Sequence, residues 1–202
     1  MKKFYFAVLA VFCVLFAACE NGQTPQTDKS KLYPAFNTSA EAWGYIDDGG
    51  NFVIQPMFDG VSGFSCGYAK VWMGNDLKFI DKKGSMQTTP SIDYAFDFYY
   101  GYSTIGLDGN MGLMGKNFDM AIQPYFYVLG TMSDNGLVAA MRTDDSKFEY
   151  VNAKGETKIP AMYDGCDAFK DGVATIKLNK KYGAINKSGD FVIQPTYEYE
   201  LW

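Results

Sequence analysis

The chain repeats one sequence pattern along most of its length. The stretch "WGYIDDGGNFVIQPMFD" at residues 43–59 returns near the end as "YGAINKSGDFVIQPTYE" at residues 182–198. Weaker copies lie between these two, and the five repeats begin at Trp43, Leu77, Met111, Phe148 and Tyr182. A unit of about 34 residues is too small to cover its own apolar face, so neighbouring repeats are expected to stack and share a continuous core.

The first half of each repeat predicts a β-hairpin. Trp43, Tyr45 and Ile46 exemplify the aromatic and β-branched residues of its first strand. In four repeats an Asp or Asn follows, with Gly at the fourth place, as in residues 47–50; this pattern is typical of a tight turn that closes a hairpin. The third repeat has "GKNF" at residues 115–118 instead, so its hairpin is predicted to be the least regular.

A glycine follows the first large residue in three of the repeats, at Gly44, Gly112 and Gly183. Lys78 and Glu149 hold this place in the other two repeats, so a positive φ is not required there. We expect the glycine to let a neighbouring ring or backbone approach closely.

The second half of each repeat predicts a second short strand, such as residues 52–54, which is expected to end at the proline that follows because proline donates no hydrogen bond to a ladder. Beyond the proline, apolar residues three apart, such as Phe58, Val61 and Phe64, predict a tight helical turn. A glycine then precedes a third strand, as in residues 68–71. Each repeat is therefore expected to be strand, hairpin, strand, helical turn and strand.

Residues 43–198 resemble tandem WG repeats of bacterial envelope proteins, in which a Trp-Gly pair, an Asx turn and a Val-Ile-x-Pro segment recur. The first and fifth repeats match strongly and the fourth well, whereas the second and third have drifted. The resemblance implies an all-β tandem array over residues 32–202 without catalytic residues. An open curved stack is favoured over a closed propeller-like ring, because 34 residues are few for a four-stranded blade. Residues 32–36 are expected to supply a lone strand ahead of the first repeat.

The first residues have the layout of a secretory signal: Lys2 and Lys3, an apolar run over residues 4–16, and then Ala-Ala-Cys ending at Cys19. A cysteine in this place resembles the lipobox of bacterial lipoproteins. The resemblance implies removal of residues 1–18, acylation of Cys19 with fatty acids such as palmitate, and a stable membrane anchor. Residues 19–31 are then a disordered tether. An ordinary secretory peptide and an uncleaved anchor are the alternatives.

The expected address is the outer membrane of the cell envelope, because Glu20 is not the Asp that holds many such lipoproteins in the inner membrane. The formal net charge of −5 becomes more negative when Lys2 and Lys3 leave with the signal. This balance argues against a nucleic-acid partner, since binding to nucleic acid depends on cationic side chains that neutralise phosphates. The predicted partners are the membrane, through the lipid, and an unknown protein or glycan.

The sequence contains no histidine, which removes the commonest general base and the commonest metal ligand. We therefore predict no catalytic residue, no metal site and no cofactor. Cys66 and Cys166 stand at non-equivalent places in the repeats and are interpreted as small buried hydrophobic residues, with a disulfide between them as the alternative.

An acidic residue recurs just beyond the proline, at Asp59, Asp93, Asp164 and Glu198. Because it appears in nearly every repeat, it is interpreted as a structural hydrogen-bond acceptor for a turn. The alternative, a pair of carboxylates for glycoside hydrolysis, requires two of them about 5 to 9.5 Å apart across a sugar.

Aromatic residues make up 17% of the chain and exceed what the repeat pattern requires. We predict that the surplus residues form a binding strip for a protein or glycan, since exposed apolar patches usually mark interaction sites; packing between repeats is the alternative. The surplus residues are Tyr99, Tyr100, Tyr102, Tyr125, Tyr127, Tyr199 and Trp202. The predicted function is thus a lipid-anchored, non-catalytic binding or scaffold module, with a purely structural envelope spacer and a carboxylate-based glycoside hydrolase as alternatives.

Overall fold

A computed structural model describes residues 31–143 and 146–201, and none of these residues is helical. Seventeen strands occupy the described residues, and every pairing between them is antiparallel. The predicted signal, Cys19, most of the predicted tether and Trp202 lie outside the described residues. In the part of the chain that is described, no helix is long and apolar enough to cross a membrane.

The strands form five successive modules. Each module is defined as the first strand of one repeat together with the strands that lie on either side of it. Module 1 contains β1 (Tyr33–Asn37), β2 (Ala42–Ile46) and β3 (Phe52–Phe58), and module 2 contains β4 (Gly60–Val61), β5 (Tyr68–Met73) and β6 (Asp76–Asp81). Module 3 contains β7 (Tyr94–Ala95), β8 (Tyr102–Leu107), β9 (Asn110–Gly115) and most of β10 (Met120–Leu129), and module 4 contains the end of β10, β11 (Leu137–Arg142), β12 (Phe148–Asn152) and β13 (Thr157–Tyr163). Module 5 contains β14 (Gly165–Cys166), β15 (Val173–Leu178), β16 (Lys181–Asn186) and β17 (Phe191–Tyr197).

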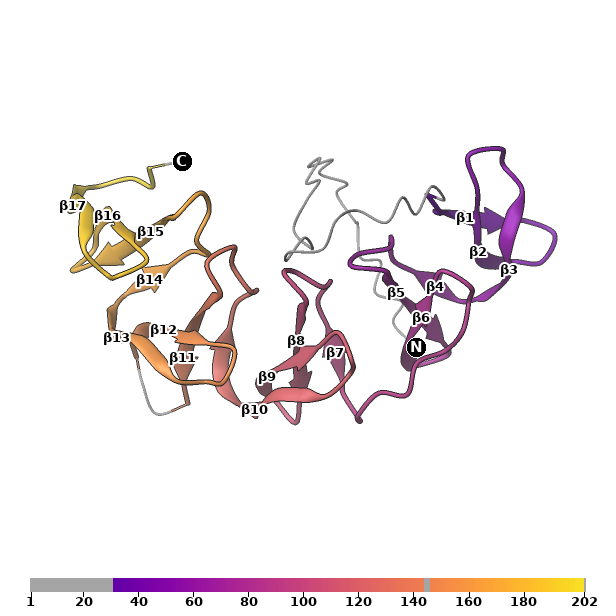
Figure 1. Ribbon diagram of the computed structural model, residues 1–202, viewed down its shortest axis with the longest axis horizontal. Helices are drawn as coiled ribbons and strands as arrows, with labels where there is room; N and C mark the ends of the chain where they lie inside the picture. The colour runs from indigo at the N-terminus through magenta and orange to yellow at the C-terminus, as the bar shows by residue number, and fades with distance from the viewer. Residues whose placement is uncertain (1–30, 144–145, 202) are drawn as a thin grey trace, which may run out of the picture.

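The modules follow one another along an open arc, with β1 to β3 at one end and β14 to β17 at the other (Figure 1). These two end modules belong to separate sheets, whereas β10 joins modules 3 and 4 into one sheet because it takes part in both. The predicted all-β array is therefore confirmed, and it is the open stack rather than a closed ring.

Each module is assembled from two repeats. The third strand of the first repeat, β5, pairs with the first strand of the second repeat, β6, with Ala69 opposite Ile80. The lone strand predicted ahead of the first repeat is β1. It pairs with β2 in module 1 as β5 pairs with β6 in module 2, with Tyr33 opposite Ile46. No repeat completes a sheet alone, which explains why the modules depend on their neighbours.

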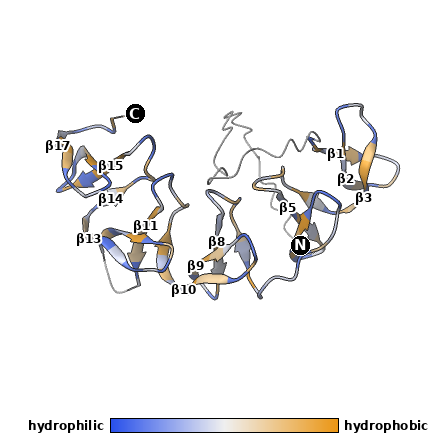
Figure 2. Cartoon of the chain, viewed as in Figure 1, coloured by the Kyte–Doolittle hydropathy of each residue, from blue (hydrophilic) through white to orange (hydrophobic). Residues whose placement is uncertain are grey.

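Apolar residues of adjacent modules share their cores. Tyr45 and Phe58 of module 1 pack in one cluster with Ala69, Val71 and Ile80 of module 2, and all five side chains are buried. Equivalent clusters join modules 3 and 4 and modules 4 and 5. Apolar residues accordingly concentrate on the strands and hydrophilic residues in the hairpin turns (Figure 2). Burial of such a side chain contributes about 1.5–3 kcal/mol.

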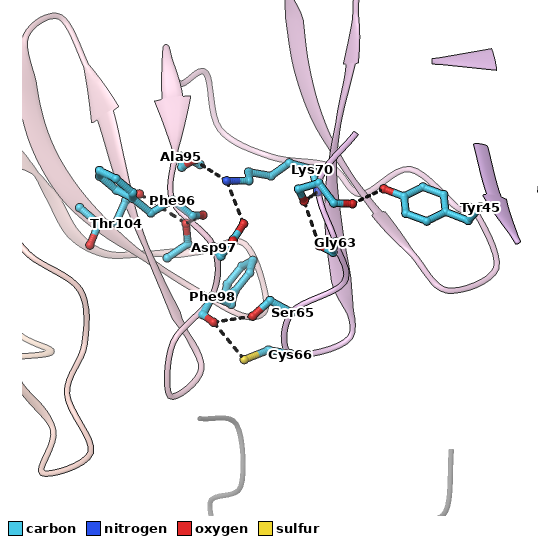
Figure 3. A network of polar contacts seen from close by, with 12 residues as sticks. Tyr45, Gly63, Ser65, Cys66, Lys70, Ala95, Phe96, Asp97, Phe98 and Thr104 are labelled. Carbon is cyan, nitrogen blue, oxygen red and sulfur yellow. Dashed lines mark hydrogen bonds and ion pairs between the residues drawn. The ribbon is translucent and has the colours of Figure 1, made fainter. Parts of the chain in front are cut away.

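Polar contacts also cross between modules. The hydroxyl of Tyr45 donates to the Ser62 carbonyl oxygen at 2.8 Å, and that of Tyr150 donates to the Asp167 carbonyl oxygen at 2.7 Å. Lys70 of module 2 reaches the next module, where its ammonium group donates to the Ala95 carbonyl oxygen at 3.0 Å. Figure 3 shows this network, in which Lys70 also pairs with the Asp97 carboxylate at 2.9 Å and the Ser65 hydroxyl donates to the Phe98 carbonyl oxygen at 2.7 Å.

The predicted hairpin turns are confirmed. The Asp47 carboxylate accepts hydrogen bonds from the backbone N–H groups of Gly49 and Asn51, both at 2.9 Å, and Gly50 has a φ of 81°. Equivalent bonds form at Asp81, Asn152 and Asn186. In the third repeat Phe118 takes the left-handed place with a φ of 63°, so this hairpin is the irregular one.

The prediction that the second strand ends at its proline is wrong. Strand β3 continues through Pro56 to Phe58, and β10, β13 and β17 continue through their prolines in the same way. The register explains why, because Tyr45 pairs with Ile54 and Trp43 with Phe58, so Gly44 alone faces three residues. Proline is tolerated in such a bulge since no ladder hydrogen bond is required of it.

The glycine of the Trp-Gly pair is required by this bulge. A Cβ at Gly44 would lie 2.5 Å from the Ile54 carbonyl oxygen and 2.8 Å from the Pro56 nitrogen. Gly112 and Gly183 meet the equivalent backbone atoms at nearly the same distances. The predicted close approach of a backbone is therefore confirmed.

The predicted helical turn after the proline is also wrong. Residues 60–61 form the short strand β4, in which Gly60 pairs with Trp72 and Val61 with Val71. Strands β7 and β14 and the end of β10 hold the equivalent place in later modules. The spacing of three between apolar residues reflects a bent, extended segment whose side chains reach the core, not a helix.

The replacement Gly44→Ala is expected to lower stability by about 1–3 kcal/mol, because the added methyl group overlaps backbone atoms that cannot move aside. Gly63→Ala is the matched control, since a Cβ at Gly63 would meet no atom within 4 Å. The thermal unfolding midpoints of both variants and the unchanged chain provide the measurement. Equal midpoints for the two variants would contradict the role given to Gly44.

Candidate functional site

The predicted binding tyrosines are separated by the fold into several places. Tyr99, Tyr100 and Tyr102 surround the turn that leads into β8 and are half-buried. Tyr125 and Tyr127 lie on β10 with exposed side chains, and Tyr199 lies beyond β17 with 82% of its surface exposed. The six of these residues that the structure describes therefore lie at three places: the turn before β8, strand β10 and the segment beyond β17.

Tyr125 of module 3 is engaged in contacts that reach module 4. Its ring stacks on Phe126, and the guanidinium carbon of Arg142 lies 5.6 Å from its ring centroid. Arg142 in turn pairs with the buried carboxylate of Glu149 at 2.7 Å, and the Glu149 carboxylate accepts a hydrogen bond from the Thr157 hydroxyl at 2.6 Å. Part of the Tyr125 surface thus packs over a structural ion pair.

Tyr100 sits at the tip of a two-residue turn. Tyr99 and Tyr102 exchange two backbone hydrogen bonds, and Tyr100 and Gly101 both have positive φ, 48° and 85°. Two positive φ values in a two-residue loop are typical of a type I′ turn, which bulky residues enter only at a cost. The turn holds the Tyr100 ring beside module 4.

Tyr100 and Tyr102 line a cavity of about 210 Å³. Ser133, Asp134 and Met132 of the turn before β11 form the other wall, together with Gly136 and Ala153. The cavity therefore combines two aromatic rings with a hydroxyl group and a carboxylate, contributed by modules 3 and 4.

The polar groups of the cavity are held in place from module 5. The Ser133 hydroxyl oxygen accepts a hydrogen bond from the Phe169 N–H at 2.9 Å, and the Asp134 carboxylate accepts one from the Asp171 N–H at 3.0 Å. Burial and the nearby carboxylates of Asp134 and Asp171 raise the pKa of Tyr100. Its hydroxyl group therefore stays protonated at neutral pH and remains a hydrogen-bond donor.

Sequence reasoning found the two tyrosines but missed Ser133 and Asp134. The sequence did contain an indication of these two residues, because the turn before Gly136 has one residue more than the turns before Gly67, Gly101 and Gly172. This extra residue contributes to the 37-residue spacing between the third and fourth repeats, where the others are 34 apart.

The recurring acidic residues have the structural role that their repetition indicated. The carboxylates of Asp59, Asp93 and Asp164 each accept a hydrogen bond from a backbone N–H in the next hairpin, at Gly74, Asp108 and Lys180. Glu198 instead pairs with Lys181 at 2.9 Å. The three aspartates thus tie one module to the next.

The cysteines do not pair with each other. Cys166 carries no disulfide, and burial raises the pKa of its thiol to about 12. It packs against the core cluster between modules 4 and 5, as expected for a small hydrophobic residue. Within residues 31–143 and 146–201, no three His, Cys, Asp or Glu side chains gather in a way that suits a metal ion.

Module 2 departs from the pattern of the other modules. In modules 1, 3, 4 and 5 the first residue of the repeat pairs with the aromatic residue that ends the bulge. The equivalent residues of the second repeat are Leu77 and Ile92, which do not pair and instead line a cavity of about 250 Å³. Among the described residues, β6 is covered on this side by the bridge between Ile80 and Met86 and by hydrogen bonds from Gln87 N–H to the Phe79 carbonyl oxygen and from Asp81 N–H to the Ser85 carbonyl oxygen.

Phe118 of the third repeat adapts module 3 to this departure. The hairpin glycines Gly84, Gly155 and Gly189 each lie against an isoleucine of the preceding module, such as Ile54. The second repeat has Thr88 in that isoleucine position. Phe118 replaces the glycine, and its ring centroid lies 4.9 Å from that of Tyr68 and 5.3 Å from that of Phe79 in module 2.

Three stretches of the chain, residues 43–75, 150–182 and 182–199, match the model of the WG containing repeat. They correspond to the first, fourth and fifth repeats, so the chain carries WG repeats at three places. A solved structure entitled "Streptogramin B lyase structure" is similar at a TM-score of 0.41 and 13% identity, covering 80% of this chain and 67% of that chain. No curated protein matches the chain.

The replacement Phe118→Ala is expected to lower stability by about 3–5 kcal/mol, because it leaves a void among Tyr68, Phe79 and Phe98. Phe96→Ala is the matched control, since the Phe96 side chain is 44% exposed. Thermal unfolding midpoints measure both effects. A loss for Phe118→Ala no larger than that of Phe96→Ala would rule out a structural role for the irregular hairpin.

Proposed function

We propose that the chain is a lipid-anchored, non-catalytic binding module of the bacterial cell envelope, which recognises a sugar residue of a glycan. The array of stacked modules provides a rigid frame, and the binding site is the cavity lined by Tyr100 and Tyr102. This cavity is the observation that carries the proposal.

The anchor is inferred from the sequence of residues 1–19, which combines two lysines, an apolar run and the lipobox-like ending at Cys19. The tether, residues 19–31, contains no large apolar side chain before Leu32. It spans at most about 45 Å when extended, so it allows the module to contact partners near the membrane surface.

The size of the cavity indicates what part of a ligand it takes. Pockets for whole small molecules usually measure about 300–1,000 Å³. A cavity of about 210 Å³ instead fits one terminal group of a larger partner. The ligand is therefore a chain of which one residue enters and the remainder lies on the surface.

The lining favours a sugar residue as that group. The faces of Tyr100 and Tyr102 suit the apolar C–H face of a sugar ring, and the Asp134 carboxylate accepts hydrogen bonds from sugar hydroxyl groups. The protonated hydroxyl of Tyr100 supplies a donor. The negative net charge of the chain and the Asp134 carboxylate disfavour a polyanion as the ligand.

A structural spacer is the second candidate, and one observation favours it. Tyr100 and Tyr102 pack against the apolar cluster that joins modules 3 and 4, together with Met111, Ala121 and Ala153. If Tyr100 and Tyr102 serve only this packing between modules, the chain needs no ligand to account for them.

Cys19→Ala is expected to abolish labelling of the protein by a fatty-acid analogue in growing bacterial cells, because it removes the thiol group to which the lipid is attached. Cys13→Ala, within the apolar run, is the matched control and is expected to keep the label. Equal labelling of the two variants would overturn the assignment of the anchor to Cys19.

Tyr100→Gly is expected to weaken glycan binding at least tenfold while preserving the fold, because glycine accepts the positive φ at this place without strain. Tyr199→Ala removes an aromatic residue outside the cavity and is expected to bind like the unchanged chain. Calorimetric titration with N-acetylglucosamine and hexose oligosaccharides is the measurement. If none of them binds the unchanged chain, the glycan proposal fails and the spacer is favoured; if Tyr100→Gly binds equally well, the cavity is not the site.

A further inference from the structure

The outer edge of most modules is protected against further strand pairing. Strands β3, β13 and β17 end their sheets, and each carries a proline inside a bulge. The proline-bearing part of β10 covers β9 in the same way. A bulged edge strand that contains proline offers an incomplete row of donors, which natural sheets use to prevent the addition of another strand.

Within residues 31–143 and 146–201, no bulged, proline-bearing strand protects the first half of β6 in module 2. The sheet order is β4-β5-β6, so β6 is the edge. Residues 85–87 cover its second half through the bridge at Ile80 and the hydrogen bond to Phe79. Its first half, Asp76–Lys78, instead borders the cavity of about 250 Å³, whose opposite wall is formed by residues 89–93.

Lys78 explains why the chain's own segment does not close over this edge. Lys78 holds the place of Gly44, where a Cβ would lie 2.5 Å from a backbone oxygen of the bulged strand. The second repeat keeps its proline, Pro90, in the regular place, so its segment would have to form that same bulge. In the fourth repeat Glu149 stands in this place, but the proline comes one residue earlier and the pairing of Phe148 with Tyr163 is retained.

A strand that does not bulge avoids this clash. A regular antiparallel neighbour lies about 4.7–4.9 Å from β6 and leaves ordinary room for a Cβ at Lys78. The other modules show which side chain belongs beside the first residue of the repeat, since Phe58, Phe126, Tyr163 and Tyr197 are opposite it there. An incoming segment therefore gains most when it is extended, free of proline and carries an aromatic residue at that point.

We propose that the open edge of β6, Asp76–Lys78, binds an extended, proline-free segment of a partner protein, which adds to module 2 as an antiparallel strand with an aromatic side chain opposite Leu77. In this segment Leu77 turns its N–H and C=O away from β5, as Phe79 and Asp81 do, so hydrogen bonds to these two groups provide the attachment, and the aromatic side chain provides the selectivity. The site does not share residues with the cavity at Tyr100, so it stands whether or not that cavity binds a glycan.

The test uses the capped peptide KTFVYTK as the probe and its analogue KTFPYTK, in which proline replaces the central valine. The unchanged chain is expected to bind the first peptide, as measured by fluorescence anisotropy, and to bind the proline analogue at least tenfold more weakly. The first peptide is also expected to slow amide hydrogen exchange in residues 76–78, through the Leu77 amide, which faces away from β5. Equal binding of the two peptides, or protection confined to other strands, would refute the proposal.

Lys78→Gly is the matched variant, because it removes the Cβ and lets residues 88–92 close over β6 as the equivalent residues of module 1 do. It is expected to bind the peptide at least tenfold more weakly and to show slowed exchange at residues 76–78 without peptide. Undiminished peptide binding by the folded variant would overturn the proposal. Protection of residues 76–78 that rises with protein concentration alone would instead assign the edge to a second copy, and the proposal would fall. The exchange measurement on the unchanged chain decides the question even if the variant does not fold.

Discussion

The fold depends on the apolar contact between one module and the next. Tyr45 and Phe58 are buried in one cluster with Ala69 and Val71 of the following module, and the same packing recurs along the array. The third strand of each repeat belongs to the sheet of its successor, so hydrogen bonding and core packing both cross the repeat boundary. In module 5, the last module that the structure describes, Tyr197 is 52% exposed although the equivalent Phe58 is buried. The stability of each module thus depends on its contact with the adjacent module.

A second constraint couples the glycine of the Trp-Gly pair to the proline about twelve residues later. The bulge brings three residues, centred on the proline, against a single residue of the neighbouring strand, and only glycine leaves room for their backbone. The two repeats without this glycine differ in outcome. The fourth repeat shifts its proline and retains the pairing, with Glu149 held by Arg142. The second repeat does not shift its proline, and its edge stays open beside Leu77.

Both candidate sites lie where the repeats deviate from one another. The cavity at Tyr100 forms beside the turn that has an additional residue near Asp134, and the open edge of β6 forms where Lys78 replaces glycine. In a repeat array the residues that follow the repeat pattern form the shared core. Residues that differ from the pattern without disturbing the neighbouring modules are therefore available for binding. Phe118 illustrates the adjustment that accompanies such a departure, because it fills the junction that the second repeat leaves incomplete.

The amino-acid sequence by itself determined the features that arise from neighbouring residues. The repeat length, the Asx turn at Asp47, the need for glycine at Gly44 and the structural role of Asp59 were all predicted, because each follows from backbone geometry or from repetition within the unit. Only the tertiary structure decided that β3 passes through Pro56, that residues 60–61 are a strand, and that Leu77 and Ile92 stay apart. These depend on the register between segments that are ten or more residues apart, and register is set by packing across the sheet and between modules, which a local pattern does not encode.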